Sequence, residues 1–405
     1  MSSVSEPASR LSYRQWLFPL SLVLFEFATY IAHDMIQPGM LQVISDFSAS
    51  ADWVSTSLTA YLCGGILLQW LLGPLSDRLG RRPVLLTGVA FFTLTCFLTV
   101  FTQSIEQFIL MRFLQGMSLC FIGAVGYAAI QEAFNETLSV KLMALMANIT
   151  LIAPLLGPLA GAAFIHYAPW KAMFALFSLI SALAFWGLWR SMPETATGRD
   201  GRFSMRRLLT DYREVLTNQG VVTGSLSIGL VTLPLLAWVA QSPVLLIQDA
   251  GMSPLRYGWL QMPVFTGLII GNIALSKLSG KVNIRTPIWL GIVPITLGLA
   301  IAACSALFMV HAWEGIIGGL SLYALGTGLV NAGLYRLTLF SSPTGKGTVA
   351  AALGLITIVV FAVGIEVAKQ LYFAWGNGIF MLAGLISGLT GALMITAFTK
   401  RAQKA

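Results

Sequence analysis

Two carboxylates interrupt the first long apolar stretch of the chain, LFPLSLVLFEFATYIAHDMIQPGM, at Glu26 and Asp34. Placing a carboxylate in hydrocarbon costs about 2.5–3.5 kcal/mol on insertion scales, so each acid needs a partner, an aqueous cavity or a function. On a helix, their separation corresponds to about 12 Å along the axis and about 80° around it, with Tyr30 between them. The two acids therefore border one broad helix face.

A guanidinium is also expected inside the membrane. The segment LMRFLQG places Arg112 deep within an apolar run, followed by Gln115 and Gly116. Such a group must find backbone carbonyls or a carboxylate. A carboxylate binds protons more tightly when it is buried and less tightly beside an Arg, so a site whose hydration and Arg distance change with conformation can load and release a proton. We therefore predict proton coupling through Glu26, Asp34 and Arg112.

Static roles remain open for these charges. Each acid can instead be permanently paired, and Arg112 can be a structural tie to backbone and Gln side chains. We expect structural roles for Arg336, in LYRLTLF, and for Glu366 and Lys369, which are spaced to pair on one helix face. Glu132 is expected to be a solvated loop residue.

The composition indicates an all-α membrane protein. The 405 residues are 57% hydrophobic and 10% charged, with a mean hydropathy of +0.80, whereas soluble domains have about 25% charged residues. Apolar runs of about 20 residues fit helical spans and exclude the alternating strands of a porin-like barrel. The cysteines lie in apolar segments without the spacing of metal ligands, so we expect neither disulfides nor a metal site. They are Cys63, Cys96, Cys120 and Cys304.

Apolar runs and polar breaks predict twelve membrane helices. They are expected to begin near Trp16, Trp53, Pro83, Ile105, Ser139, Trp170, Gly220, Pro254, Pro287, Trp313, Gly347 and Asn377. The longest polar interval contains RDGRFSMRRLLTDYREVL, which is typical of a short amphipathic helix on the membrane surface. We expect an N-terminal six-helix bundle over 1–190, a cytoplasmic linker over 191–218 and a C-terminal six-helix bundle over 219–405.

The basic residues indicate topology rather than nucleic-acid binding. The net charge is +8, but Lys and Arg are spread through short loops instead of forming one stripe. Placing the N-terminus in the cytoplasm puts nearly all loop Lys and Arg inside and leaves Lys171, Arg256 and Lys369 facing outward. We therefore expect a multi-pass protein of the bacterial cytoplasmic (inner) membrane with both termini cytoplasmic.

Two further segments have the composition of conformational motifs. The loop GPLSDRLGRRP combines glycines for a tight turn with an acid that can sit at a helix N-terminus or pair with an Arg. The fifth apolar segment contains APLLGPLAGAA, whose small residues at four-residue spacing favour close helix packing and whose prolines favour a bend. The residues concerned are Gly73, Asp77, Arg78, Gly80, Arg81, Arg82, Pro154, Gly157, Pro158 and Gly161. Topogenic charge and static packing remain the alternatives.

Together these stretches resemble the major facilitator superfamily, over the whole chain, and most closely its MdfA-type twelve-helix drug/proton antiporters. Glu26, Tyr30, Asp34 and Pro38 occupy the places of the first-helix pattern of that group. The resemblance implies two six-helix bundles around a central cavity. Two departures are visible: Ala153 and Ala162 replace glycines of the antiporter pattern, and His33 stands where Asn is more usual.

A pocket for lipophilic compounds should be largely apolar with a few polar groups. If the first, fourth and fifth spans surround a cavity together with the C-terminal half, the candidate lining residues come from both halves. They are Tyr30, His33, Asp34, Gln115, Met146, Thr150, Leu235, Leu236, Val239, Phe265 and Phe361.

These observations favour a proton-coupled exporter in which protonation of Glu26 or Asp34 competes with substrate. The lipophilic cationic and neutral drugs expected as substrates come from the family resemblance. A narrow metabolite exporter or a proton symporter of the same fold remains an alternative. A membrane-embedded enzyme is disfavoured because HExxH and GxSxG are absent, and an ATP-driven pump because no GxxxxGK[ST] loop occurs.

The expected energy source is the proton gradient, with no cofactor and no metal. The expected partners are small lipophilic molecules, protons and membrane lipids, without nucleic acid, and the protein is expected to act as a monomer.

Overall fold

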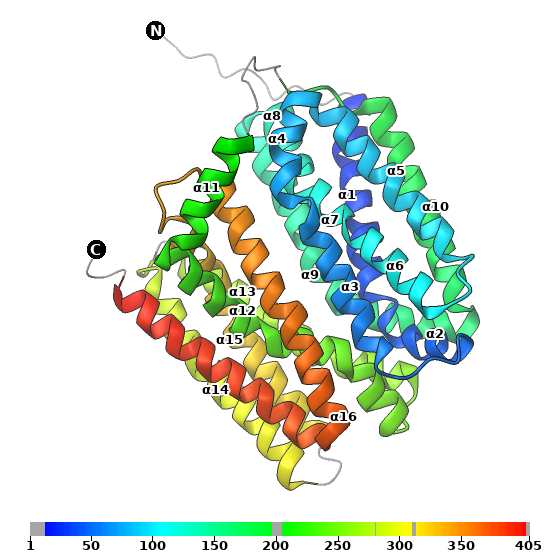
Figure 1. Ribbon diagram of the computed structural model, residues 1–405, viewed down its shortest axis with the longest axis vertical. Coiled ribbons are helices and arrows are strands. Elements are labelled where there is room, and N and C mark those ends of the chain that lie inside the picture. The colour runs from blue at the N-terminus through cyan, green and yellow to red at the C-terminus, as the bar shows by residue number, and fades with distance from the viewer. Residues whose placement is uncertain (1–12, 197–204, 280, 310–312, 402–405) are drawn as a thin grey trace.

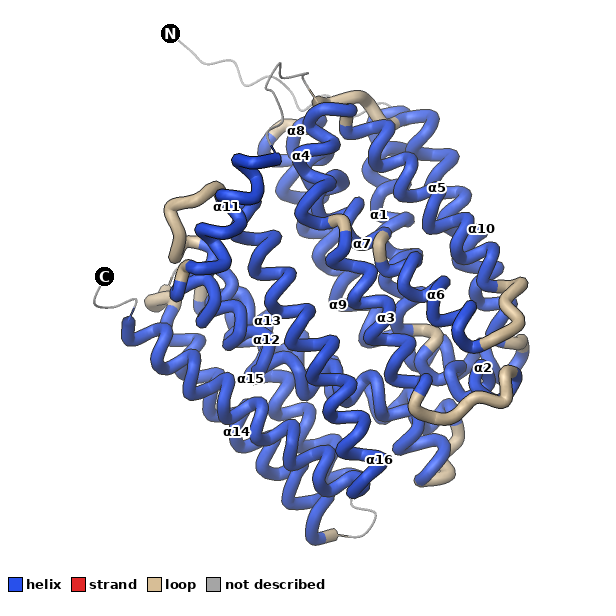
Figure 2. Tube along the Cα trace, in the orientation of Figure 1, coloured by secondary structure: helices blue, strands red, loops and turns tan. Residues whose placement is uncertain are grey.

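The structure is a computed structural model that describes residues 13–196, 205–279, 281–309 and 313–401. The described residues form helices joined by short connections, without strands (Figure 2). In the first half the helices are α1 (Tyr13–Asp34), η1 (Gln37–Gly39), α2 (Met40–Asp46), α3 (Trp53–Leu67), α4 (Gln69–Leu79), α5 (Arg81–Thr99), α6 (Ile105–Gly116), α7 (Ser118–Phe121), η2 (Ile122–Gly126), α8 (Tyr127–Ala133), α9 (Glu136–Tyr167) and α10 (Trp170–Ser191).

The second half begins after a separate helix, α11 (Met205–Thr217), which lies within the expected linker. It contains α12 (Gln219–Ser242), η3 (Pro243–Asp249), α13 (Pro254–Leu278), α14 (Arg285–Phe308), α15 (Trp313–Leu339) and α16 (Lys346–Arg401). Gly376 in α16 has φ 78° and is not helical, so α16 is two helices that meet there. Figure 1 shows the orange part running down and the red part returning.

The number of membrane spans agrees with the sequence. Ten helices in the described part of the chain are long and apolar enough to cross a membrane, and α3 and α4, bent by 41°, together form an eleventh. Counting the two parts of α16 separately gives twelve. Their starts lie within three residues of the expected ones. The prediction of an all-α, twelve-span membrane fold is therefore confirmed.

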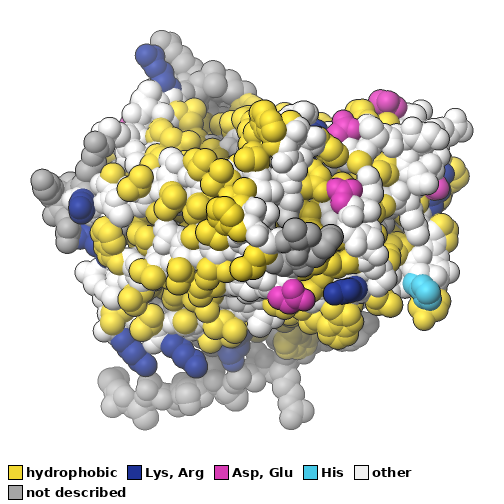
Figure 3. Space-filling view, turned by 90° about the horizontal axis from the view of Figure 1, so that it is seen from below, with side chains coloured by type: hydrophobic (Ala, Val, Ile, Leu, Met, Phe, Trp, Pro, Cys, Tyr) yellow, Lys and Arg dark blue, Asp and Glu magenta, His cyan; other side chains and the backbone are white. Residues whose placement is uncertain are grey.

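The outer surface of the helices is that of a membrane protein. Large hydrophobic side chains are exposed along α5, α10, α14 and α16, including Leu94, Leu183, Leu290 and Leu393. Seen from the lower end in Figure 3, hydrophobic side chains cover much of the surface and charged side chains are scattered. Such a surface needs hydrocarbon rather than water around it.

The helices pack as two bundles, α1 to α10 and α12 to α16, which lie side by side in Figure 1. The bundles contact each other mainly through α9 against α13 and α3 against α16. A Cβ atom on Gly258 would lie 2.8 Å from Leu159 Cα, and Ser55 Oγ donates to Gln241 Oε1 at 2.6 Å. These contacts lie toward the helix ends opposite Tyr13, so the bundles are joined at that end.

Small residues on α9 set its distance from the end of α1. A Cβ atom on Gly157 would lie 2.5 Å from Asp34 Cβ, and one on Gly161 would overlap the carbonyl oxygen of Met35. Ala153, on the same face, is fully buried. The four-residue spacing of small residues therefore packs α9 directly on the backbone that carries Asp34, and α9 stays one helix through Pro154 and Pro158.

Replacing Gly161 by Ala should push α9 away from α1 and lower the stability by about 1–3 kcal/mol, the usual penalty for overpacking a tight interface. The measurement is the thermal unfolding midpoint of the purified protein in detergent. The matched control is Gly318→Ala on α15, where an added Cβ atom meets nothing within 4 Å. Equal midpoints for both variants would contradict this account of the α9 interface.

Candidate functional site

Glu26 lies inside the N-terminal bundle. Its side chain is fully buried on α1, and the Tyr127 hydroxyl of α8 donates to Oε1 at 3.1 Å. The second oxygen, Oε2, is buried and has no hydrogen-bond partner among the described residues. The carboxyl group therefore does not face lipid, and one of its oxygens is open to a proton.

Asp34 occupies the end of α1, two turns further along. It is 3% exposed, and its Oδ1 lies 2.9 Å from His33 Nδ1. Its Oδ2 is buried without a partner in the part of the chain that the structure describes. Because Gly157 of α9 packs on the Asp34 Cβ atom, this carboxyl group is fixed at the junction of α1 and α9.

Arg112 of α6 is fully buried and is held without a carboxylate. Its Nη1 donates to Gln115 Oε1 at 2.8 Å and to the Ala32 carbonyl at 3.4 Å, and its guanidinium lies 4.5 Å from the centre of the Tyr61 ring. No acid side chain lies within 4.0 Å of it among the described residues. In this conformation Arg112 is tied to amide, carbonyl and aromatic groups, and neither Glu26 nor Asp34 is locked to it.

The polar residues around Arg112 connect α1, α3, α5 and α6. Gln115 Nε2 donates to Thr99 Oγ1 at 2.8 Å, and the Tyr61 hydroxyl donates to the Thr29 carbonyl at 2.9 Å. Gln115, which the sequence suggested as a substrate ligand, is fully buried in this network. Its side chain therefore supports Arg112 in this conformation, and its contact with substrate stays a prediction.

The remaining candidate lining residues come from both bundles. Met146, Leu235, Val239 and Phe265 are buried, and Tyr30, Thr150, Leu236 and Phe361 are half-buried. They belong to α1, α9, α12, α13 and α16. Their role as substrate contacts stays a prediction.

A polar cluster in the C-terminal bundle was not foreseen from the sequence. Gln261 Oε1 accepts from Trp238 Nε1 at 2.9 Å, and Gln261 Nε2 donates to Ser242 Oγ at 3.2 Å. Tyr257 OH lies 3.5 Å from the same Ser242 hydroxyl. The polar residues of AQSP at the end of α12 and the Gln of α13 were the available signal in the sequence. Only packing brings these two segments together.

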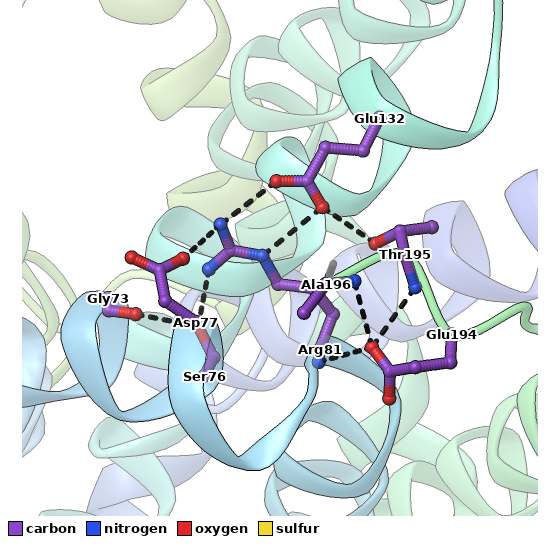
Figure 4. Close-up of polar contacts among 8 residues, drawn as sticks. All are labelled: Gly73, Ser76, Asp77, Arg81, Glu132, Glu194, Thr195 and Ala196. Atoms are coloured by element: carbon purple, nitrogen blue, oxygen red, sulfur yellow. Dashed lines mark hydrogen bonds and ion pairs between the residues drawn. The ribbon is translucent and has the colours of Figure 1, made fainter. Parts of the chain in front are cut away.

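Figure 4 shows the charged network around the loop after α4. Arg81 forms an ion pair with Asp77, donates to Ser76 Oγ at 2.5 Å, and binds both Glu132 oxygens, at 3.0 and 3.3 Å. Asp77 thus takes the Arg-paired role of the two that the sequence allowed. Glu132 is exposed, as expected of a solvated residue, but it lies on α8 rather than in a loop and is paired with Arg81.

The helix N-terminus in this motif is occupied by Glu194, which follows α10. Its carboxylate accepts from the backbone N–H of Arg81 at 2.8 Å and of Arg82 at 3.3 Å. A negative group there satisfies free N–H donors and complements the helix dipole. Gly80 has φ 103°, and a Cβ atom on it would collide with the Glu194 carboxylate, so glycine is needed for both reasons.

The other motif residues have simpler surroundings. Arg82 Nη2 donates to the Trp189 carbonyl at 2.7 Å, Arg78 is exposed, and a Cβ atom on Gly73 would meet nothing within 4 Å. The network therefore joins α4, α5, α8 and the segment after α10 chiefly through Arg81.

The expectations for the charged residues of the C-terminal half are met at one site and not at the other. Lys369 and Glu366 form the expected ion pair, and Lys369 Nζ also donates to Thr56 Oγ1 of α3 at 2.9 Å. Arg336, expected to tie helices together, is exposed and lies over the ring of Phe340 at 5.4 Å. The expectation for Arg336 is wrong in this conformation because its side chain leaves the bundle.

The family model described as "Major Facilitator Superfamily" matches residues 22–368 of the chain. The chain belongs to the major facilitator superfamily. The chain is 57% identical to "Multidrug transporter MdfA" of Yersinia pestis (strain Angola), over 100% of this chain and 99% of that protein. It is 53% identical to the protein of the same name from Escherichia coli O6:H1 (strain CFT073), over 98% and 96%.

Solved structures of the superfamily share the fold. The partially occluded inward-open xylose transporter XylE from E. coli has a TM-score of 0.73 at 14% identity, covering 96% of this chain and 98% of that one. A bacterial homolog of the human lysosomal transporter Spinster has a TM-score of 0.74 at 13% identity, covering 97% and 98%. A major facilitator chain is a transporter, so the enzyme alternative is excluded.

The Arg81 network predicts coupled effects on stability. Asp77→Asn or Glu132→Gln alone leaves Arg81 one carboxylate, whereas the double variant leaves a largely buried guanidinium without any. We expect the double variant to lose about 0.5–3 kcal/mol more than the sum of the single losses. The measurement is thermal unfolding of the four proteins, with Glu214→Gln, which removes an exposed carboxylate on α11, as a neutral control. Additive losses would mean that Arg81 does not join the two acids energetically.

Proposed function

We propose that the chain is a proton-coupled multidrug efflux antiporter that exports lipophilic cationic and neutral compounds by alternating access. The observation that carries the proposal is the state of the two α1 acids: both are buried, each has one oxygen without a partner among the described residues, and neither is paired with Arg112. Relatives at 53–57% identity over nearly the whole chain are named multidrug transporters, which supports the drug specificity.

The proposed exchange follows from the electrostatics of burial. An ionised carboxylate in a low-dielectric interior needs a proton, a cation or water, so a lipophilic cation and a proton are competing ways to neutralise Asp34 or Glu26. Rocking of the two bundles exposes the acids to one side of the membrane and then to the other. Because either ligand neutralises the same carboxylate, a cationic substrate binds when the proton leaves.

The parts of the chain have distinct proposed roles. The N-terminal bundle (1–190) binds the proton through Glu26 and Asp34, with Arg112 as the charge whose distance changes. The C-terminal bundle (219–405) contributes Leu235, Leu236, Val239, Phe265 and Phe361 to the substrate pocket, and Tyr30, Gln115, Met146 and Thr150 complete it. The loop from Gly73 to Arg82 and the Gly157–Gly161 face are the segments whose packing changes as the bundles move. Residues 191–218 link the bundles.

Neutralising the acids should abolish substrate-linked proton release. Adding tetraphenylphosphonium to purified protein in weakly buffered detergent should release protons, and Asp34→Asn or Glu26→Gln should reduce this release because a proton site is lost. Glu314→Gln, which removes an exposed carboxylate at the start of α15, is the control and should release protons normally. Unchanged release in both α1 variants would remove these acids from the coupling mechanism.

Transport itself separates antiport from the alternatives. In vesicles with imposed pH and voltage gradients, an antiporter expels a cationic and a neutral compound against their gradients when protons flow the other way. A narrow metabolite carrier would ignore most dyes, and a proton symporter would move substrate in the direction of the protons.

We also propose a location in the bacterial cytoplasmic membrane with both termini in the cytoplasm, because that orientation places nearly all loop Lys and Arg inside. A green fluorescent protein fused after Ala405 should fluoresce, since it folds in the cytoplasm and not after unfolded export. A dark fusion that is exported and full length would reverse the orientation.

A further inference from the structure

His33 and Asp34 form a hydrogen-bonded pair of proton-binding groups inside the N-terminal bundle. The side chains are 14% and 5% exposed, and Nδ1 of the imidazole lies 2.9 Å from Oδ1 of the carboxylate. The outer atoms of the pair, His33 Nε2 and Asp34 Oδ2, are both buried and have no partner among the described residues. The pair therefore has two vacant positions for one proton.

The proton accounting is the same for either position. With neutral His33 donating Nδ1–H to an ionised Asp34, the pair carries one negative charge. A proton added at Nε2 gives an imidazolium beside a carboxylate, and a proton added at Oδ2 gives a neutral acid beside a neutral imidazole. Both products have no net charge. When two such sites interact, proton binding belongs to the pair rather than to either residue.

Aromatic and charged side chains from several helices surround the pair. The Tyr61 ring of α3 lies 5.0 Å from the His33 ring, and the Arg112 guanidinium lies over that same Tyr61 ring. His33 and Arg112 therefore both lie beside the Tyr61 ring. Among the described residues, the titratable and charged groups within electrostatic range of Asp34 are Tyr30 of α1, Tyr61 of α3, Arg112 of α6 and Tyr257 of α13. On the α9 side, Gly157 presents backbone only.

We propose that His33 shares the coupling proton of Asp34 and thereby sets the pH at which the site exchanges that proton for a cationic substrate. The inference rests on the proposed proton-coupled exchange. Asn at position 33 keeps a hydrogen-bond donor toward Asp34 but has no basic nitrogen. His33 is thus a positioning residue for Asp34 that is also a second proton acceptor.

The test is the pH dependence of tetraphenylphosphonium binding, because this cation keeps its charge at every pH. The full-length protein, His33→Asn and His33→Gln are purified and titrated with the cation across a pH series. We expect the midpoint of binding to move to lower pH by about one unit or more in both variants, since the imidazole, with an ordinary pKa near 6.5, no longer accepts the proton. At the alkaline limit, the affinity for the cation should change less than about threefold, because the hydrogen bond to Asp34 is retained.

His166→Asn is the matched control, because His166 is an exposed histidine near the end of α9 that lies outside the pair. Its binding profile should superimpose on that of the unaltered protein. Superimposable profiles for the two His33 variants would overturn the proposal. So would a loss of affinity at all pH values with an unmoved midpoint, because that result makes His33 purely structural.

A second measurement follows the proton directly. In protein with ¹⁵N-labelled histidine and both other histidines replaced (His166→Asn and His311→Asn), the His33 nitrogen shifts should change in the pH step of substrate binding, and Asp34→Asn should move that step. A His33 signal that stays constant through the step would overturn the proposal. If the unaltered protein bound the cation with no pH dependence, the proposed proton coupling itself would fail, which distinguishes the two claims.

Discussion

A carboxylate enclosed by membrane-spanning helices must be neutralised, paired or hydrated, and the arrangement around α1 follows from this constraint. Glu26 has one hydrogen bond from Tyr127, and Asp34 has one contact with His33. Within the part of the chain that the structure describes, each is left with one oxygen that has no hydrogen-bond partner. Neither acid is fully compensated by the residues that the structure describes, which is what the proposed coupling requires.

The same constraint explains why Arg112 is held apart from the acids. A buried Arg–carboxylate pair in a fixed geometry would keep the acid ionised in every conformation, and no proton could be exchanged. Here the guanidinium is stabilised by Gln115, the Ala32 carbonyl and the Tyr61 ring instead. In the proposed mechanism, its positive charge acts on the acids from a distance that changes when the helices move.

Helix packing fixes these groups in space. Gly157 and Gly161 let α9 lie on the backbone at the end of α1, and α9 in turn contacts α13 of the other bundle through Leu159 and Gly258. The acid-bearing end of α1 is therefore one helix away from the interface between bundles. At the opposite helix ends, Arg81 and Glu194 join α4, α5 and the segment that leads into the linker. Under the proposed alternating access, a rocking motion of the bundles would reach the acids through α9.

The sequence by itself determined the spans, because a run of about 20 apolar residues has no stable place except across a bilayer. It also singled out Glu26, Asp34 and Arg112, since charges are rare and costly in such runs. Only the tertiary structure decided the partners. Arg81 meets Glu132 and Glu194 across separations of 51 and 113 residues, Arg336 points out of the bundle, and Gln115 turns inward to Arg112. Apolar patterning specifies which residues are buried in the membrane, but it is nearly uniform around these helices, so it cannot specify which helix faces meet.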